Sequence, residues 1–131
     1  MRIATLAALP DDGVPRQFPV IADRQDAWTR YRDEAIGAVY LRRQPGSEEV
    51  EAFNATCPHA GCFVAFNRDR DVYQCPCHDS AFNADGQLNY GPSPRGLDQL
   101  DADVRAAGEQ KEIWVRYVDY YTGIEDKIPK L

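Results

Sequence analysis

The residues with the most distinctive chemistry are four cysteines and two histidines, which all lie within 22 residues of one another. They form two short segments, Cys57-Pro58-His59-Ala60-Gly61-Cys62 and Cys75-Pro76-Cys77-His78-Asp79-Ser80. Each segment supplies one Cys and one His at close spacing, together with one further Cys. Cysteine and histidine are the side chains that bind zinc and iron most readily. The spacing therefore predicts a metal centre held between two loops.

Two metal centres are compatible with this ligand set. Two Cys and two His can hold a single zinc ion, which would make the chain a zinc-stabilised binding module. Zinc fingers, however, usually present a pair of cysteines followed by a pair of histidines, whereas each segment here mixes the two types. That mixture suits a two-iron cluster in which two Cys bind one iron and two His bind the other. The ligand count then leaves Cys62 and Cys77 over, and cysteines on neighbouring loops can pair.

Length and composition describe an ordinary soluble domain. The chain has 131 residues, of which 44% are hydrophobic and 27% are charged, as expected for one globular domain. A net charge of −6 argues against binding to nucleic acid or to an anionic membrane surface, since both favour a basic face. No stretch approaches the roughly 20 apolar residues of a membrane span, and the first residues do not resemble a signal peptide.

Turn residues recur at close intervals and separate short β-rich runs, which predicts an all-β sandwich or barrel. We expect one helix, at residues 23–32, and a hairpin that turns at Ala107-Gly108. The metal-binding segments then lie on loops at strand ends, where a β scaffold usually presents functional groups. The expected strands are residues 17–22, 35–42, 49–54, 63–67, 71–74, 87–90, 98–105 and 111–121.

The two segments resemble the signature of Rieske [2Fe–2S] proteins. They are most similar to the disulfide-containing branch found in cytochrome bc-type quinol–cytochrome c reductases. A third segment, Gly91-Pro92-Ser93-Pro94, resembles the proline loop that covers the cluster in this family. The end of the chain, from Trp114 to Pro129, is also similar to the tail of some bacterial members. The resemblance is strong over residues 53–97 and looser elsewhere.

Carried over position by position, the resemblance implies a role for each segment. It implies that Cys57 and Cys75 bind the inner iron and that His59 and His78 bind the outer iron. It also implies a disulfide between Cys62 and Cys77, and it places Ser80 where a hydroxyl donates to a bridging sulfide. The family fold is an antiparallel β-sandwich base that carries a small cluster-binding subdomain. In this chain it would be a single domain, 1–131, with the subdomain at about 53–97.

Three positions depart from the family pattern. High-potential members usually have a Tyr two residues after the serine, and here that residue is Phe82, which has no hydrogen-bond donor. The residue after the second histidine is Asp79 in place of the usual Gly. Both changes predict a lower reduction potential. The residue after the first histidine is Ala60, whereas quinol-oxidising members commonly have Leu there.

The resemblance implies a one-electron carrier without substrate chemistry of its own. The expected role is the iron–sulfur subunit, or its soluble domain, of a respiratory quinol–cytochrome c oxidoreductase, with quinol and b-type and c-type cytochromes as partners. The alternative is a soluble Rieske ferredoxin or the small subunit of another oxidoreductase, such as an arsenite-oxidase-like enzyme. A disulfide favours the extracytoplasmic (periplasmic) face of an energy-conserving membrane. The alternative would place the protein in the cytoplasm.

Overall fold

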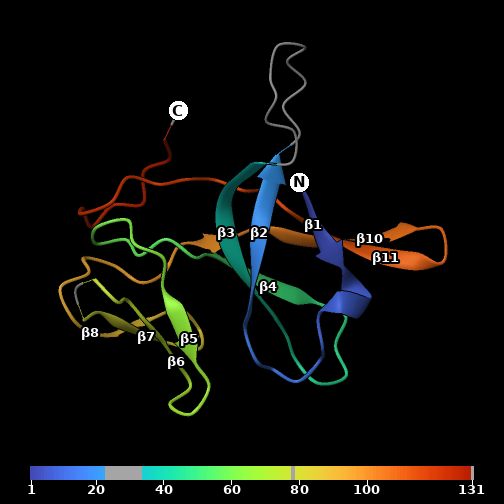
Figure 1. The fold of residues 1–131 in the computed structure, drawn as a ribbon, viewed down its shortest axis with the longest axis horizontal. Coiled ribbons are helices and arrows are strands. Elements are labelled where there is room, and N and C mark those ends of the chain that lie inside the picture. The colour runs from blue at the N-terminus through green and yellow to red at the C-terminus, as the bar shows by residue number, and fades with distance from the viewer. Residues whose placement is uncertain (23–33, 78, 131) are drawn as a thin grey trace.

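The computed structural model describes residues 1–22, 34–77 and 79–130 (Figure 1). In these ranges the chain forms antiparallel strands and one short 3-10 helix, η1. The helix expected at residues 23–32 lies outside the described residues. In the described part of the chain, no helix is long and apolar enough to span a membrane. The elements are β1 (Arg2–Thr5), η1 (Leu6–Ala8), β2 (Arg16–Ala22), β3 (Glu34–Arg43), β4 (Val50–Asn54), β5 (Ala65–Asn67), β6 (Val72–Gln74), β7 (Ala81–Asn83), β8 (Leu88–Tyr90), β9 (Gln99–Leu100), β10 (Ala102–Ala107) and β11 (Gln110–Val115).

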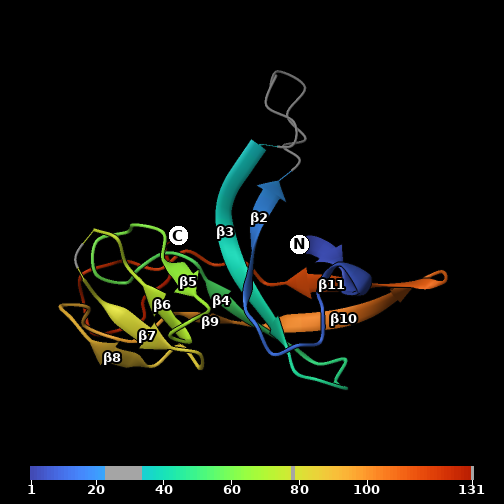
Figure 2. The same ribbon diagram turned by 60° about the horizontal axis from the view of Figure 1, so that its bottom comes forward.

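The strands form three sheets, with the orders β1-β11-β10, β2-β3-β4-β9 and β5-β6-β7-β8. Figures 1 and 2 show the third sheet beside the other two, on the side away from the β10–β11 hairpin. In the sequence this sheet lies between β4 and β9, and these two strands pair with each other through Ala52 opposite Leu100. Residues 54–98 therefore leave the base and return to it at one place.

Strand β3 separates two hydrophobic cores. Successive side chains of a strand point to opposite faces, so Val39 and Leu41 lie in the core of the base. Ala38 and Tyr40 lie in the second core, which also contains Cys57 and Cys75. Because both faces of β3 are buried, a shift of one residue in its register would exchange the two sets. The packing of β3 therefore sets the position of the cysteine segments relative to the first two sheets, which form the base.

The second core is organised around Tyr73 of β6, which is completely buried. Its ring packs edge to face against Tyr40 and Phe66, with both pairs of ring centroids 5.0 Å apart. The Tyr40 hydroxyl donates to the Val64 carbonyl at 2.9 Å and accepts from the Phe66 N–H at 3.2 Å. These contacts join the third sheet to the base directly below the cysteines.

The predicted all-β antiparallel fold is confirmed. The expected hairpin forms, but Ala107 pairs with Gln110, so its turn is Gly108-Glu109, one residue later than expected. Most expected strands are shifted by one or two residues, and two differ more. Residues 98–105 divide into β9 and β10, because β9 pairs with β4 whereas β10 pairs with β11. The strand expected at 111–121 ends at Val115, after which the chain crosses toward the cysteine segments. Strands β1 and β7 were not expected.

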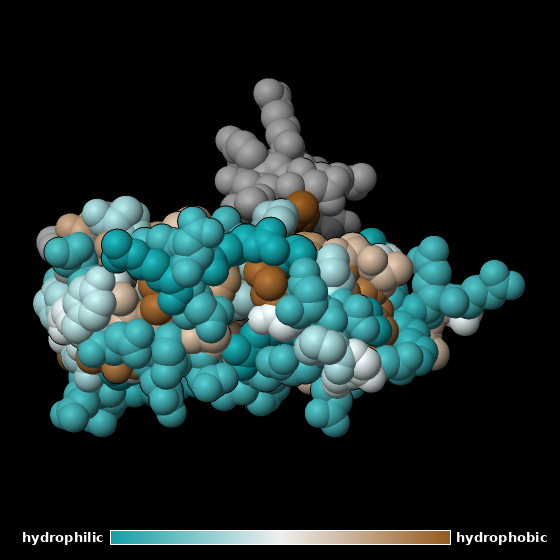
Figure 3. Space-filling model, turned by 90° about the horizontal axis from the view of Figure 1, so that it is seen from below, coloured by the Kyte–Doolittle hydropathy of each residue, from teal (hydrophilic) through white to brown (hydrophobic). Residues whose placement is uncertain are grey.

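The face shown in Figure 3 is mostly hydrophilic. Its hydrophobic residues appear as separate small spots and do not merge into a broad patch. This agrees with the acidic, charge-rich composition.

Candidate metal centre

The two cysteine segments are loops of the same construction. The first, residues 57–62, follows β4, and the second, residues 75–80, connects β6 to β7. In the first loop the Cys57 N–H donates to the Cys62 carbonyl at 2.6 Å, and in the second the Cys75 N–H donates to the Ser80 carbonyl at 2.8 Å. Each six-residue loop is thus closed by a bond from its first residue to its last.

A disulfide joins the two loops. It links Cys62 to Cys77, as the family resemblance implied, with the two Cα atoms 6.5 Å apart. The free cysteines are Cys57 and Cys75, and both are buried. The four cysteines therefore divide into an oxidised pair that ties the loops together and a reduced pair beneath them.

Cys57 and Cys75 lie in the same hydrophobic core, and Cys75 is near enough to disfavour ionisation of Cys57. The pKa of Cys57 is raised to about 11, mainly by burial and also by the neighbouring Cys75, while the backbone N–H groups of His59 and Ala60 partly offset the rise. A buried thiolate needs a compensating charge. A metal cation would supply that charge to both sulfurs, and the backbone N–H groups are already directed at one of them.

We expect the metal-free protein to lose stability as the pH rises from about 9 to about 11. Cys57 has a pKa of about 11 in the folded chain and an ordinary value of 9.0 when exposed. In that window the unfolded chain binds fewer protons, so the free energy of unfolding falls, by up to about 1.4 kcal/mol per pH unit from this thiol. Urea unfolding at several pH values measures the slope. The control is Cys57→Ala, whose slope should be shallower; equal slopes would contradict the assignment.

The third loop, residues 91–94, lies against the second. The Ser93 N–H donates to the Ser80 hydroxyl oxygen at 3.1 Å, and both serines are buried. Ser80 Oγ thus accepts a bond from the third loop and keeps its own proton for another acceptor. Gly91 has a φ of +111°, and a Cβ there would overlap the Ser80 backbone. The third loop therefore covers the second through a position that only glycine can occupy without displacement.

The remaining predicted residues differ in their burial and backbone conformation. His59 is partly buried and Ala60 is exposed, whereas Phe82 is fully buried in the core that holds both free cysteines. Asp79 is exposed and has a φ of +59°. That left-handed conformation favours Gly and tolerates Asp better than most residues. His78 lies outside the described residues.

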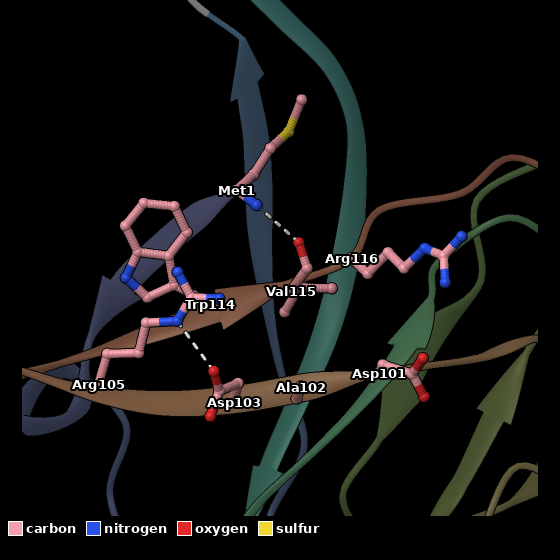
Figure 4. A pocket seen from close by; sticks show the side chains of 8 residues that line it. All are labelled: Met1, Asp101, Ala102, Asp103, Arg105, Trp114, Val115 and Arg116. Carbon is pink, nitrogen blue, oxygen red and sulfur yellow. Dashed lines mark hydrogen bonds and ion pairs between the residues drawn. The ribbon is translucent and has the colours of Figure 1, made fainter.

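Two surface hollows are candidates for the functional site. One, of about 280 Å³, opens beside the second loop between Cys75, Ser80 and Tyr90. The other, of about 390 Å³, lies on the β10–β11 hairpin, where the Arg105 side chain rests on the Trp114 ring (Figure 4). Arg105 lies 4.6 Å from the ring centroid and pairs with Asp103 at 2.9 Å. Its charge is already matched within the chain, so we place the functional site at the loops.

Comparison with known proteins identifies the family of this domain. Residues 9–101 match the family model of the Rieske [2Fe–2S] domain. The chain is 42% identical over 72 residues to the chloroplastic cytochrome b6-f complex iron-sulfur subunit of Arabidopsis thaliana, which covers 53% of this chain and 31% of that protein. It is 43% identical over 65 residues to the corresponding subunit of a Synechococcus strain, covering 50% and 38%. The chain spans about a third of the length of these curated relatives.

A solved structure shows the same fold. The crystal structure of the cyanobacterial plasma membrane Rieske protein from Synechocystis superposes with a TM-score of 0.58 and 24% identity, covering 87% of this chain and 98% of that one. In this chain the fold carries a disulfide between two loops and two buried free cysteines. The chain belongs to the Rieske [2Fe–2S] family, and the cofactor of that family is a Rieske-type [2Fe–2S] cluster.

The donor set fits this cofactor. A Rieske cluster takes two cysteines on one iron and two histidines on the other. The chain offers two buried free thiols side by side and a partly buried His59 on the same loop as Cys57. Among the residues that the structure describes, no three Cys, His, Asp or Glu side chains converge as ligands of a single ion. Sequence reasoning missed Arg95, and it missed that the C-terminal segment contacts the first loop through the bond from the Gly123 N–H to the Pro58 carbonyl.

Proposed function

We propose that this chain is a one-electron carrier whose cluster is held by Cys57 and Cys75 on the inner iron and by His59 and His78 on the outer iron. The observation that carries the proposal is the pair of buried free thiols below the Cys62–Cys77 disulfide. The position of His59 on the partly exposed side of the first loop supports an outer iron within reach of a partner. His78 is assigned as a ligand only from its position in the sequence signature.

Histidine ligation sets the range of the reduction potential of the site. An oxidised [2Fe–2S] core has a charge of +2, so two thiolates make the site neutral, whereas four would make it a dianion. Addition of an electron to a neutral site is easier, which is why Rieske centres span about −150 to +300 mV and plant-type ferredoxins lie near −400 mV. The Ser80 hydroxyl would raise the potential by donating to the bound cluster. Phe82, which lies in the core with both free cysteines, has no such donor.

The role supported best is that of the iron–sulfur subunit, or its soluble domain, of a quinol-oxidising cytochrome bc-type complex. The chain would accept an electron from quinol beside a b-type cytochrome and pass it to a c-type cytochrome. The curated relatives, which are named as subunits of cytochrome b6-f complexes, support partners of this kind. The disulfide supports an oxidising location on the extracytoplasmic face of the membrane, because such bonds are rare in the cytosol.

The second candidate is a soluble Rieske ferredoxin or the small subunit of another oxidoreductase. Ala60 favours it, because this exposed residue replaces the Leu that is common in quinol-oxidising members. A cytochrome b gene beside the gene for this chain, together with co-purification of that cytochrome, would support the first role. A neighbouring gene for the large subunit of a different oxidoreductase would support the second.

We also propose that residues of about 53–97 form a cluster-binding subdomain inserted in the single domain 1–131. The pairing of β4 with β9 supports this division, since the chain enters and leaves the third sheet between those strands. The hydrophobic core that contains Tyr73 and both free cysteines lies at the boundary with the base. The subdomain would therefore depend on β3 for part of its stability.

Metal and redox analysis of the purified protein tests the proposed function. We expect about two irons and two acid-labile sulfides per chain, and a midpoint potential within the Rieske range. At alkaline pH the potential should fall by about 60 mV per pH unit, because the oxidised cluster loses an imidazole proton before the reduced one does. Zinc as the only metal would refute the proposal. So would a potential near that of plant ferredoxins that stays constant into the alkaline range.

A further inference from the structure

Arg95 immediately follows the third loop, and it is almost completely buried. Its side chain is 10% exposed, and the partner Asp98 side chain is 5% exposed. The guanidinium donates to both carboxylate oxygens of Asp98, at 2.8 and 2.9 Å. Such a fork-shaped pair holds both side chains in one orientation. Because a buried ion pair often adds little net stability, the groups that this pair holds in place are more informative than the pair itself.

The same guanidinium binds the C-terminal segment. It donates to the Tyr121 carbonyl at 2.9 Å and to the Ile124 carbonyl at 2.8 Å. Figure 1 shows this segment running from β11 toward the loops beside the third sheet. Arg95 thus has donors left after it satisfies Asp98, and it uses them to fix backbone that belongs to neither a helix nor a strand.

Between the two carbonyls held by Arg95 lies the contact with the first loop. The Gly123 N–H donates to the Pro58 carbonyl at 2.7 Å. Pro58 is buried and stands between Cys57 and His59. The segment is further folded on itself by a bond from the Tyr121 N–H to the Ile128 carbonyl at 2.9 Å. What Arg95 fixes is therefore the piece of chain that supports the two ligand positions of the first loop.

Arg95 also reaches the second loop, through the third. The Ser93 hydroxyl donates to the Arg95 carbonyl at 2.8 Å, and the Ser93 N–H donates to Ser80 Oγ at 3.1 Å. Hydrogen bonds therefore connect Ser80 to Ser93, Ser93 to Arg95, and Arg95 to Tyr121 and Ile124, the residues on either side of the Gly123 contact with Pro58. They connect the same two loops as the disulfide but by a separate route.

We propose that Arg95 is a positioning residue for the cluster. It holds residues 121–124 against the first loop and so gives the two ligand loops a second brace besides the Cys62–Cys77 disulfide. This inference rests on the proposed function, because the object that is positioned is the cluster. The brace keeps the backbone N–H groups of His59 and Ala60 directed at the Cys57 sulfur, where they favour the more negative reduced cluster.

The decisive variant is Arg95→Lys, with Arg95→Gln as the larger change. Lysine keeps the charge beside Asp98, but its ammonium cannot bridge a carboxylate and two carbonyls as a guanidinium fork does. The matched control is Arg105→Lys, which alters an exposed arginine that also pairs with an aspartate, on the β10–β11 hairpin. Hydrogen exchange of the Gly123 amide, the midpoint potential and the rate of cluster loss are measured on the protein as purified.

In Arg95→Lys we expect the Gly123 amide to exchange about tenfold faster or more. The potential should fall and the cluster should be lost faster, while Arg105→Lys behaves like the wild type. The effect should be larger in a Cys62→Ala/Cys77→Ala background, because the other brace is then absent. Wild-type exchange and potential in Arg95→Lys would overturn the inference, as would faster exchange with unchanged cluster properties. Absence of iron and sulfide would instead refute the proposed function, and Gly123 exchange would still test the brace.

Discussion

Gly91→Ala should destabilise the protein by about 2–5 kcal/mol and release the third loop from the second. The φ of Gly91 is +111°, which L side chains rarely adopt, and a Cβ there would lie 2.8 Å from Ser80 Oγ and 2.9 Å from the Asp79 carbonyl oxygen. Relief of these contacts must move Ser80, whose hydroxyl accepts the Ser93 N–H. Denaturant unfolding measures the loss, and iron content after purification measures the effect on the cluster.

Gly108→Ala is the control for this variant. Gly108 also has a positive φ, +65°, but a Cβ at that position would meet nothing within 4 Å. Gly108→Ala should therefore lower the free energy of unfolding only by the cost of a left-handed conformation, about 1–2 kcal/mol. Its iron content should be normal. Equal losses in the two variants would show that contact with Ser80 is not what makes glycine necessary at position 91.

Cys62→Ala/Cys77→Ala should lower the free energy of unfolding by about 3 kcal/mol, on the loop-entropy model of disulfide stabilisation. The bridge closes a segment with a sequence separation of 15 residues and joins the loops that carry the free cysteines. Its removal should also speed cluster loss, because the loops can then separate. Urea unfolding with and without reductant measures the change: the wild type should lose stability on reduction, whereas the double variant should not respond.

Thiol titration provides the matching chemical test. After removal of metal under non-reducing conditions, the unfolded wild-type chain should present two thiols, those of Cys57 and Cys75. The double variant should present the same number, since it lacks only the cysteines of the bridge. Four thiols in the wild type would mean that the disulfide does not form.

The sequence by itself determined the local features of the site. Six-residue loops with Cys, Pro and His at fixed positions specify their own bend and donor types, so the cysteine segments and the third loop were identified without coordinates. The β10–β11 hairpin was found for the same reason, because the turn chemistry is contained in neighbouring residues. The family signature added the Cys62–Cys77 pairing, which donor counting alone had left open.

Only the tertiary structure decided where the chain beyond Val115 runs. Its residues look like a continued strand, but the Asn54 side chain donates to the Val118 carbonyl at 2.9 Å. Further along, Arg95 binds the Tyr121 carbonyl, and the Gly123 N–H donates to the Pro58 carbonyl. These partners are distant in the sequence, and no local pattern records them. Similarly, the left-handed backbone of Asp79 follows from the closed second loop. The sequence of each loop thus determines which side chains are available as metal ligands. Hydrogen bonds between residues distant in the sequence determine how rigidly those loops are held.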